Sequence, residues 1–249
     1  MRRRLHELIT AFSVAGCSTP PAPAPESSEV TPFSRSRAGA PLPLDWQSLV
    51  ISKNKLRTHY ETVVDPLTQR VVLRARAKKA CTGLKQRLSV DPATRPVIEW
   101  EWRVKQLIED ADNTSRDTED SPVRLLLFFD GDRIGLPMRD QMALDLAQLA
   151  SGVTPPFATL MYIWENRQPV GSIIESTYTR QVKMVVAGSG TGLLGGWTTF
   201  QRNYVDDYWL AFGHAPGRLI GVGILTDSDN TGAAVEAFYG DIRLLTALP

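Results

Sequence analysis

The residues best able to do chemistry in this chain are two aspartates and an asparagine near its end. An apolar run, 219–225, leads into a loop that carries Asp227, Asp229 and Asn230. Buried strands often present polar residues at their ends, where loops hold functional groups on a rigid scaffold. The sequence therefore predicts a ligand-binding site at Asp227, Asp229 and Asn230.

The same loop has part of the pattern of a calcium site. Asp227, Asp229, Thr231 and Gly232 occupy four places of an EF-hand loop, but Phe238 stands where a bidentate glutamate is needed. This excludes an EF-hand and leaves two alternatives. In the first, Asp227 and Asp229 bind a hard cation, calcium, with the help of oxygen atoms from other loops. In the second, the loop closes with its own hydrogen bonds and an arginine neutralises the aspartates; the candidates are Arg167, Arg180 and Arg202.

A second candidate group ends another strand-like run. Trp164 could stack on a sugar ring, with Glu165 and Asn166 as hydrogen-bonding partners for its hydroxyl groups. In the alternative interpretation, Trp164 packs in the core with Leu160 and Tyr162, and Glu165 lies in solvent.

The third candidate group lies in an acidic loop, 110–122. Asp112 and Asn113 are its best ligand-binding residues, although a solvated loop is the ordinary interpretation of such a charge run. Carboxylates on separate loops serve both cation sites and glycosidases. Whether this loop meets Glu165 and Asp227 in space decides between these interpretations.

Bulk composition sets limits on the function. The chain has 249 residues, 43% of them hydrophobic, and a formal net charge of +1. This is an ordinary globular composition. The charge balance gives no reason to expect a nucleic-acid partner, and no apolar run is long enough to span a membrane.

The N-terminus predicts export. A basic segment, Arg2 to Arg4, precedes a short apolar run and the lipobox V-A-G-C, which ends at Cys17. We expect residues 1–17 to be a lipoprotein signal peptide, Cys17 to be lipidated, and the Pro/Ala/Ser-rich segment 18–40 to be a tether. The protein would then lie in the bacterial cell envelope, in the periplasm or at the outer membrane, with a lipid anchor as its only membrane contact. The alternative is a disordered cytoplasmic N-terminus with a chance V-A-G-C.

The remaining residues, 41–249, predict a β-sandwich domain. Short strand patterns separated by turn residues dominate, and one of them, 97–104, alternates Trp100 and Trp102 with Glu99 and Glu101. Two segments show apolar residues at helical spacing: 139–150, with Met142, Leu146, Leu149 and Ala150, and 205–212, with Val205, Trp209 and Phe212. The pattern favours a mainly β, antiparallel sandwich of the jelly-roll, galactose-binding-like kind with two short inserted helices.

A glycine motif in this domain resembles a nucleotide-binding loop. Gly190, Gly192 and Gly195 satisfy G-x-G-x-x-G, but a strand pattern follows where the motif requires a helix. We therefore predict a hairpin loop here and no nucleotide site.

Several sequence blocks in a fixed order point to a family. The blocks include W-E-W-R-V, L-F-F-D-G-D, Y-I-W-E-N-R-Q-P-V-G-S, R-N-Y-V-D-D-Y and T-D-S-D-N-T-G followed by Y-G-D-I-R. From about Leu42 to Leu244 the chain resembles the bacterial domain-of-unknown-function family three-zero-four-seven. The resemblance implies export but no particular activity. The ending Y-G-D-I-R-L is also similar to the last strand of jelly-roll carbohydrate-binding modules.

The sequence is compatible with three functions. The first is a non-catalytic β-sandwich of the cell envelope that binds a glycan or a similar polar ligand, with calcium as its potential cofactor. The second is a glycoside hydrolase or lyase-like enzyme, which would need two carboxyl groups roughly 5–9 Å apart across an open cleft. The third is a purely structural envelope protein whose acidic residues only close loops.

Overall fold

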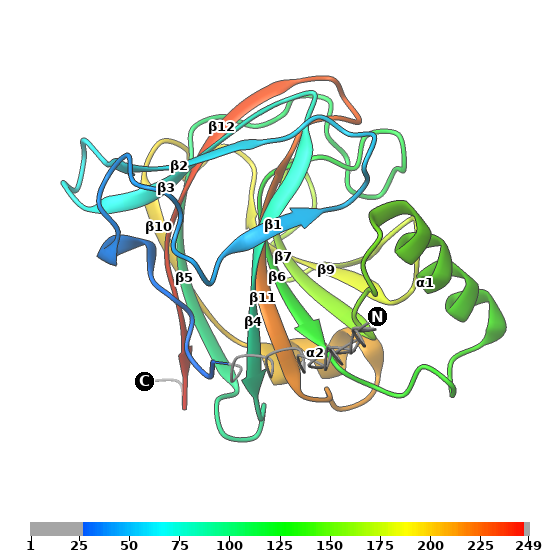
Figure 1. The fold of residues 1–249 in the computed structure, drawn as a ribbon. Coiled ribbons are helices and arrows are strands. Elements are labelled where there is room, and N and C mark those ends of the chain that lie inside the picture. Colours follow the sequence, from blue (N-terminus) through cyan, green and yellow to red (C-terminus); the bar gives the residue numbers. More distant parts are fainter. Residues whose placement is uncertain (1–26, 247–249) are drawn as a thin grey trace, which may run out of the picture.

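Two β-sheets packed face to face make up the part of the chain that the computed structural model describes, residues 27–246 (Figure 1). The strand orders are β1-β4-β11-β6-β7-β9-β8 in the seven-stranded sheet and β10-β5-β12-β3-β2 in the five-stranded sheet. The strands are β1 (Gln47–Val50), β2 (His59–Val64), β3 (Val71–Lys78), β4 (Cys81–Val90), β5 (Val97–Val104), β6 (Ser121–Phe129), β7 (Ala158–Glu165), β8 (Ile173–Glu175), β9 (Val182–Ser189), β10 (Trp197–Asn203), β11 (Leu219–Asp227) and β12 (Ala234–Leu245). The helices are η1 (Phe33–Arg35), a 3-10 turn, and the α-helices α1 (Met138–Ser151) and α2 (Tyr204–Phe212). The predicted mainly β sandwich with two inserted helices is confirmed.

Eight of the strands form a jelly roll. β3 pairs with β12, β4 with β11, β5 with β10, and β6 with β7, so the chain resembles one long hairpin of paired strands rolled up. Successive pairs alternate between the two sheets. This is the double Greek-key arrangement of jelly-roll proteins. One pair of described strands departs from the predicted antiparallel pattern: β7 and β9 are parallel, and β8 lies beyond β9 at the sheet edge.

The core between the sheets confirms the predicted register of β5. Trp100 and Trp102 are each 1% exposed, whereas Glu99 and Glu101 on the opposite side are partly exposed. The two indoles contact each other and the ring of Phe200 from β10. The alternation of polar and apolar residues therefore fixed which side of this strand is buried.

Helix α1 has the predicted position but the opposite orientation. It ends at Gly152, whose φ of +76° gives the left-handed cap expected of glycine. Met142, Leu146 and Leu149, predicted to face the core, are 58–78% exposed, and the buried side carries Leu144 instead. The prediction of a core-facing stripe was wrong because no residue of this helix belongs to the main core cluster among the described residues, so its apolar side chains have no core to face.

Helix α2 also differs in its buried face. Asn203 caps its first turn by accepting hydrogen bonds from two backbone N–H groups. Of the predicted face, Val205 and Phe212 pack against the core, but Trp209 is 56% exposed. Tyr204 and Tyr208 are fully buried and contact Phe129. This short helix has apolar residues on more than one side, so their spacing alone does not identify the buried side. The aromatic residues of the core, such as Phe129, determine which side packs.

The glycine-rich loop 190–195 is not a hairpin. It connects β9 in the seven-stranded sheet to β10 in the five-stranded sheet, so it crosses between the layers. The prediction of a hairpin was wrong in this respect, since adjacent strands in sequence need not pair in a jelly roll.

The packed part of the chain begins before residue 41, where the sequence analysis placed the start of the domain. Val30 and Phe33 are buried, and the Phe33 ring stacks on Trp46 at 4.8 Å between ring centroids. The C-terminal part of the predicted tether therefore covers the sandwich. The predicted signal peptide, including Cys17, lies outside the described residues. Within those residues, no helix has the length and apolar character needed to cross a membrane.

Candidate functional site

The face of the seven-stranded sheet that points away from the five-stranded sheet, here called the outer face, carries the candidate site. Along β6, Leu125 and Leu127 belong to the core between the sheets, whereas Leu126 and Phe128 point the other way. Leu126 packs there with Leu225 of β11. The outer face is thus apolar in its middle, although it is not covered by the second sheet.

A cavity of about 1130 Å³ lies over the outer face. Ligand-binding cavities are typically roughly 300–1,000 Å³, so this one is large enough for a small molecule or a short oligomer. Residues 48–53 form one wall, and the end of α1 with residues 153–157 forms the other. Figure 1 shows β1 and α1 on the two sides of this face. The walls meet where the Lys53 side chain lies against Gly152: a Cβ added at Gly152 would be 2.9 Å from Nζ of Lys53.

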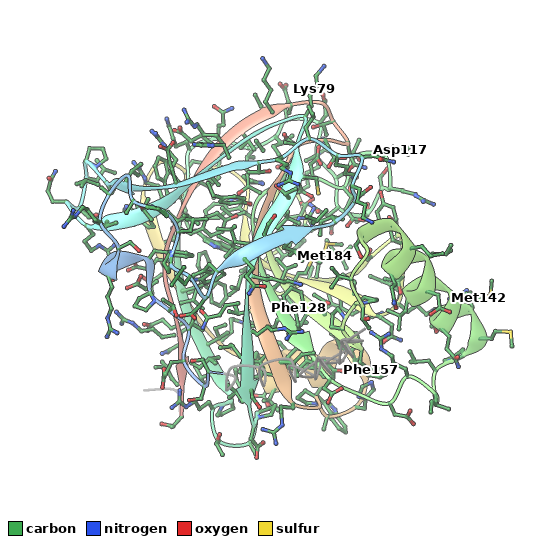
Figure 2. All side chains as sticks on the ribbon, in the orientation of Figure 1. Lys79, Asp117, Phe128, Met142, Phe157 and Met184 are labelled. Carbon is green, nitrogen blue, oxygen red and sulfur yellow. The ribbon has the colours of Figure 1, made fainter. Side chains whose placement is uncertain are left out.

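The floor of the cavity holds an aromatic ring on two glycines. Gly221 and Gly223 of β11 lie beside Phe128 of β6, and a Cβ added at either glycine would be 3.1–3.2 Å from carbon atoms of the phenyl ring. A larger side chain at these positions would displace the ring. Phe128 therefore lies across the bare backbone of β11 and is partly exposed to the cavity. Figure 2 shows Phe128 and Phe157 on this side of the molecule.

Positive charge is concentrated around the cavity. Among the described residues, its lining includes seven cationic side chains and three acidic ones, although the whole chain has 28 basic and 27 acidic residues. The cations are Lys53, Lys55, Arg57, Lys85, Arg87, Arg124 and Arg133, and the acids are Glu119, Asp130 and Asp227. The local excess is therefore a property of this surface and not of the composition.

At one end of the cavity, Arg124 and Asp227 form a buried ion pair. Nε of Arg124 donates to Oδ1 of Asp227 at 3.1 Å, and the backbone N–H of Ser121 donates to the same oxygen at 3.0 Å. Burial raises the pKa of Asp227 to about 6; the Arg124 charge opposes that rise, and Asp120 adds to it. The cost of removing the carboxylate from water thus exceeds the attraction of its partner.

Asp229 pairs with Lys55 at the same end. The Lys55 ammonium contacts a carboxylate oxygen of Asp229. Burial lowers the pKa of Lys55, but the hydrogen bond and charge of Asp229 outweigh burial and raise it. The Cys81 thiol lies with Asp227 and Asp229 in a group of potential metal ligands, and burial followed by the two carboxylate charges raises its pKa. Each aspartate therefore already has a protein cation opposite it.

The arginines named as candidates for this neutralisation have other places. Arg202 pairs with Asp207, and Arg180 lies 3.9 Å from Glu175. Arg167 is exposed in the turn after β7, where its backbone N–H bonds to Glu165. Arg124, in the middle of the apolar segment that forms β6, holds Asp227 instead. The three candidate arginines were wrong because the arginine that neutralises Asp227 lies on a neighbouring strand of the sheet. β6 and β11 pair with each other although about 100 residues separate Arg124 from Asp227 in the chain.

The three loops named in the sequence analysis meet beside this end of the cavity. The backbone N–H of Asn113 donates to Glu165 at 3.4 Å, and the Asn166 amide donates to two carbonyl groups that precede Asn113, at 2.7 and 2.9 Å. Asp120 accepts a hydrogen bond from the backbone N–H of Asn230 at 3.2 Å. These groups bond to one another, so the junction holds the loops together.

The predicted site residues therefore divide into two sets. Asp227 and Asn230 line the cavity, and Asp229 lies next to it through Lys55. Trp164 is 1% exposed and donates its indole N–H to the carbonyl of Gly190, which agrees with the core alternative, so Trp164 itself is not a sugar platform.

The other members of the second set close turns. Glu165 is buried and accepts backbone hydrogen bonds from Arg167 and Gln168, whereas it was expected to lie in solvent if Trp164 was in the core. Asp112 accepts two hydrogen bonds from Thr114. Asn113 and Asn166 join the loop junction described above.

Sequence reasoning missed the cavity itself, although two signals were present. One is the arginine in the apolar segment S-P-V-R-L-L-L-F-F, since an unpaired cation would be costly inside a strand of this kind. The other is L-I-G-V-G-I-L, where glycines alternate on one side of a strand and leave room for a neighbouring ring. Neither signal shows which strands lie side by side.

Comparison with known proteins finds several similar solved structures, and three of them are described here. A xylan-binding module, CBM86, from Roseburia intestinalis has a TM-score of 0.34 at 9% identity, over 81% of this chain and 96% of that module. A beta-1,2-glucanase from Parabacteroides distasonis has a TM-score of 0.35 at 10% identity, over 82% of this chain but 23% of the glucanase. The carbohydrate recognition domain of Emp47p has a TM-score of 0.39 at 11% identity, over 91% of this chain and all of that domain. Because all three TM-scores are below 0.5, these similarities do not bear on the function of this chain.

The sequence comparisons identify the family. The search of curated proteins found no match. The model of the family described as "Protein of unknown function (DUF3047)" matches residues 44–243, which is most of the chain and agrees with the resemblance found in the sequence. This protein is therefore a member of the DUF3047 family.

Proposed function

We propose that this protein is a non-catalytic binding protein of the cell envelope that holds a saccharide in the cavity on the outer face. The observation that carries the proposal is the Phe128 ring, which lies across Gly221 and Gly223 on the floor of the cavity. A ring held flat and partly exposed presents an apolar surface that suits the apolar face of a sugar. Binding sites commonly combine such a surface with a few placed polar groups.

Hydroxyl and amide groups around the ring support the same ligand class. Ser48, Ser52, Thr154 and Thr179 line the cavity, and Asn230 lies at the end beside Asp227. Neutral donors and acceptors of this kind match the hydroxyl groups of a sugar, which both donate and accept.

The acidic residues of the cavity favour binding over catalysis. Asp227 is held by Arg124 and by the Ser121 backbone, and Glu119 lies 4.0 Å from the same guanidinium. A glycosidase needs one carboxyl group free to donate a proton and a second free to attack or to activate water. Here Asp227 and Glu119 share one buried arginine, and Asp130, the third acid of the lining, accepts the backbone N–H of Gly131. Each of the three carboxyl groups thus already has a partner in the protein.

The location at the cell envelope is part of the proposal. It rests on the basic segment, apolar run and lipobox cysteine of the N-terminus, with Cys17 as the lipid-bearing residue. Lipidation would tether the cavity to the membrane without any membrane-spanning segment.

Methyl NMR on methionine-labelled protein tests the cavity as the binding site. Met161 lies on the cavity floor, whereas Met142 points away from the body on the exposed side of α1 (Figure 2). Addition of soluble oligosaccharides, neutral and acidic, should shift the Met161 signal and leave the Met142 signal in place. Phe128→Ala should abolish the shift, and Trp209→Ala, which removes an exposed aromatic from α2, should not. If no saccharide of either kind moves Met161, the proposed function is wrong.

A further inference from the structure

We infer that the saccharide bound in the cavity is acidic and that its carboxylate lies against Lys85 and Arg87. This inference rests on the proposed function, since it concerns the ligand of the same cavity. It depends on which cations of the cavity already have partners and which do not.

Two of the seven cations of the lining are paired with a carboxylate, and a third lies at the end of a helix. Lys55 pairs with Asp229, and Arg124 pairs with Asp227. Lys53 lies against Gly152, the cap of α1, where the last carbonyl groups of a helix favour a positive charge. Lys55 and Arg124 are therefore committed to their carboxylates, whereas Lys53 lies at the helix end without a carboxylate partner.

Five cations of the lining have no acidic partner within 4.0 Å among residues 27–246: Lys53, Arg57, Lys85, Arg87 and Arg133. Of the three acids in the lining, Glu119 and Asp227 lie beside Arg124, and Asp130 does not. The Asp130 carboxylate accepts a hydrogen bond from the backbone N–H of Gly131. Positive charge thus exceeds negative charge at the end of the cavity away from Asp227. An anionic group would balance this excess.

Lys85 and Arg87 lie beside the aromatic floor. They alternate on β4, and the strand pairing places Lys85 opposite Gly223 and Arg87 opposite Gly221. The same two glycines lie under the Phe128 ring. A sugar ring resting on Phe128 would therefore carry a carboxylate at its edge toward Lys85 and Arg87, and the planar guanidinium could bind both carboxylate oxygens.

The environment of Lys85 is consistent with an anion at this position. Burial lowers its pKa, and the like charge of Arg87 lowers it further. A carboxylate between the two cations would reverse the second effect, because an opposite charge favours the protonated amine. Neutral sugars would leave the two cations repelling each other.

The decisive experiment compares an acidic and a neutral sugar of equal length. A trimer of galacturonic acid carries carboxylate groups where a trimer of galactose with the same linkage carries hydroxymethyl groups. Binding of both soluble trimers can be measured by calorimetry and by the Met161 signal. We expect the acidic trimer to bind at least about tenfold more tightly, because one hydrogen bond to a charged group is worth roughly this factor. The preference should shrink as salt is raised, since Arg87 is exposed and its charge is screened.

Charge variants separate a local contact from a general effect of net charge. Lys85→Gln/Arg87→Gln should remove the preference for the acidic trimer and keep the binding of the neutral one. The control Lys78→Gln/Lys79→Gln removes the same charge outside the cavity, at the end of β3 where Figure 2 labels Lys79, and should keep the preference. Equal binding of both trimers, each with a Met161 shift, would overturn the acidic ligand and leave the proposed function standing. Binding of neither trimer, with Met161 unmoved by other saccharides, would overturn both.

Discussion

Arg124 and Asp227 form an ion pair between neighbouring strands at a position that solvent hardly reaches: their side chains are 2% and 7% exposed, and Nε lies 3.1 Å from Oδ1. The pair closes one end of the cavity and connects β6 to β11. Because the carboxylate is buried, its protonation is coupled to the stability of the fold.

The first prediction concerns pH. Asp227 ordinarily titrates near 3.8 and does so at about 6 in the folded protein. Between these pH values the unfolded chain releases the proton while the folded chain retains it, so the free energy of unfolding should fall as pH rises from about 4 to 6. The change is about 3 kcal/mol at most, from the usual conversion of a pKa difference to free energy. Urea unfolding of wild type and Asp227→Asn across this range measures it.

Two variants sharpen this test. The asparagine in Asp227→Asn cannot titrate, so the free energy of unfolding of this variant should lack the fall between pH 4 and 6 that Asp227 causes. Arg124→Met removes the charge that lowers the Asp227 pKa, so the falling part of the curve should extend to higher pH than in wild type. Identical slopes in all three proteins would mean that Asp227 is not the titrating group.

The second prediction concerns calcium. We expect calcium to leave the melting temperature unchanged, because Arg124 and Lys55 already neutralise Asp227 and Asp229. A ligand that binds only the folded state would raise the melting temperature with its concentration. Thermal melts with calcium and with a chelator decide the question, with Asp227→Asn/Asp229→Asn as the control. A rise in wild type that the double variant lacks would establish the metal site instead.

The third prediction concerns the core. Trp102→Ala should destabilise the protein by about 3–5 kcal/mol, the usual loss for truncating a buried large aromatic. The matched control is Trp209→Ala on α2, which removes an indole that is 56% exposed and should cost far less. Chemical unfolding of both variants gives the two values, and a loss below about 1 kcal/mol for Trp102→Ala would contradict the assigned packing.

The fourth prediction concerns the junction of the loops. Asp120 is fully buried and accepts hydrogen bonds from Asn230 and from both the backbone and the hydroxyl group of Thr231. Asp120→Ala should cost about 3 kcal/mol, because it leaves buried donors without an acceptor. Asp120→Asn retains one acceptor oxygen and should lose less. Equal losses in the two variants would show that the side chain contributes through its charge alone.

The fifth prediction concerns the N-terminus. If Cys17 carries a lipid, the wild-type protein should partition into a detergent phase, and Cys17→Ser should move it to the aqueous phase. Cys81→Ser is the matched control, because Cys81 is a buried thiol on β4 and its loss should not change partitioning. Aqueous partitioning of wild type would contradict lipidation.

The sequence by itself determined the local structure and the fold class. Alternation of Trp100 and Trp102 with two glutamates set the buried side of β5. Each α-helix ends at a glycine of positive φ, Gly152 after α1 and Gly213 after α2. Such signals depend on neighbours along the chain, since strand periodicity and helix capping are local properties. The jelly-roll class followed from many short strands and from the resemblance of the last one.

The tertiary structure decided which distant residues meet. Asp227 was visible in the sequence as a polar residue at a strand end, but its partner Arg124 became visible only when β6 and β11 were placed side by side. The cavity has the same origin, because Phe128 and Gly223 belong to different strands and Lys85 to a third. The exposed side of α1 was likewise set by what the helix covers. Which strands pair in a jelly roll depends on contacts between residues far apart in the chain. The local pattern of polar and apolar residues identifies each strand but not its neighbours in the sheet.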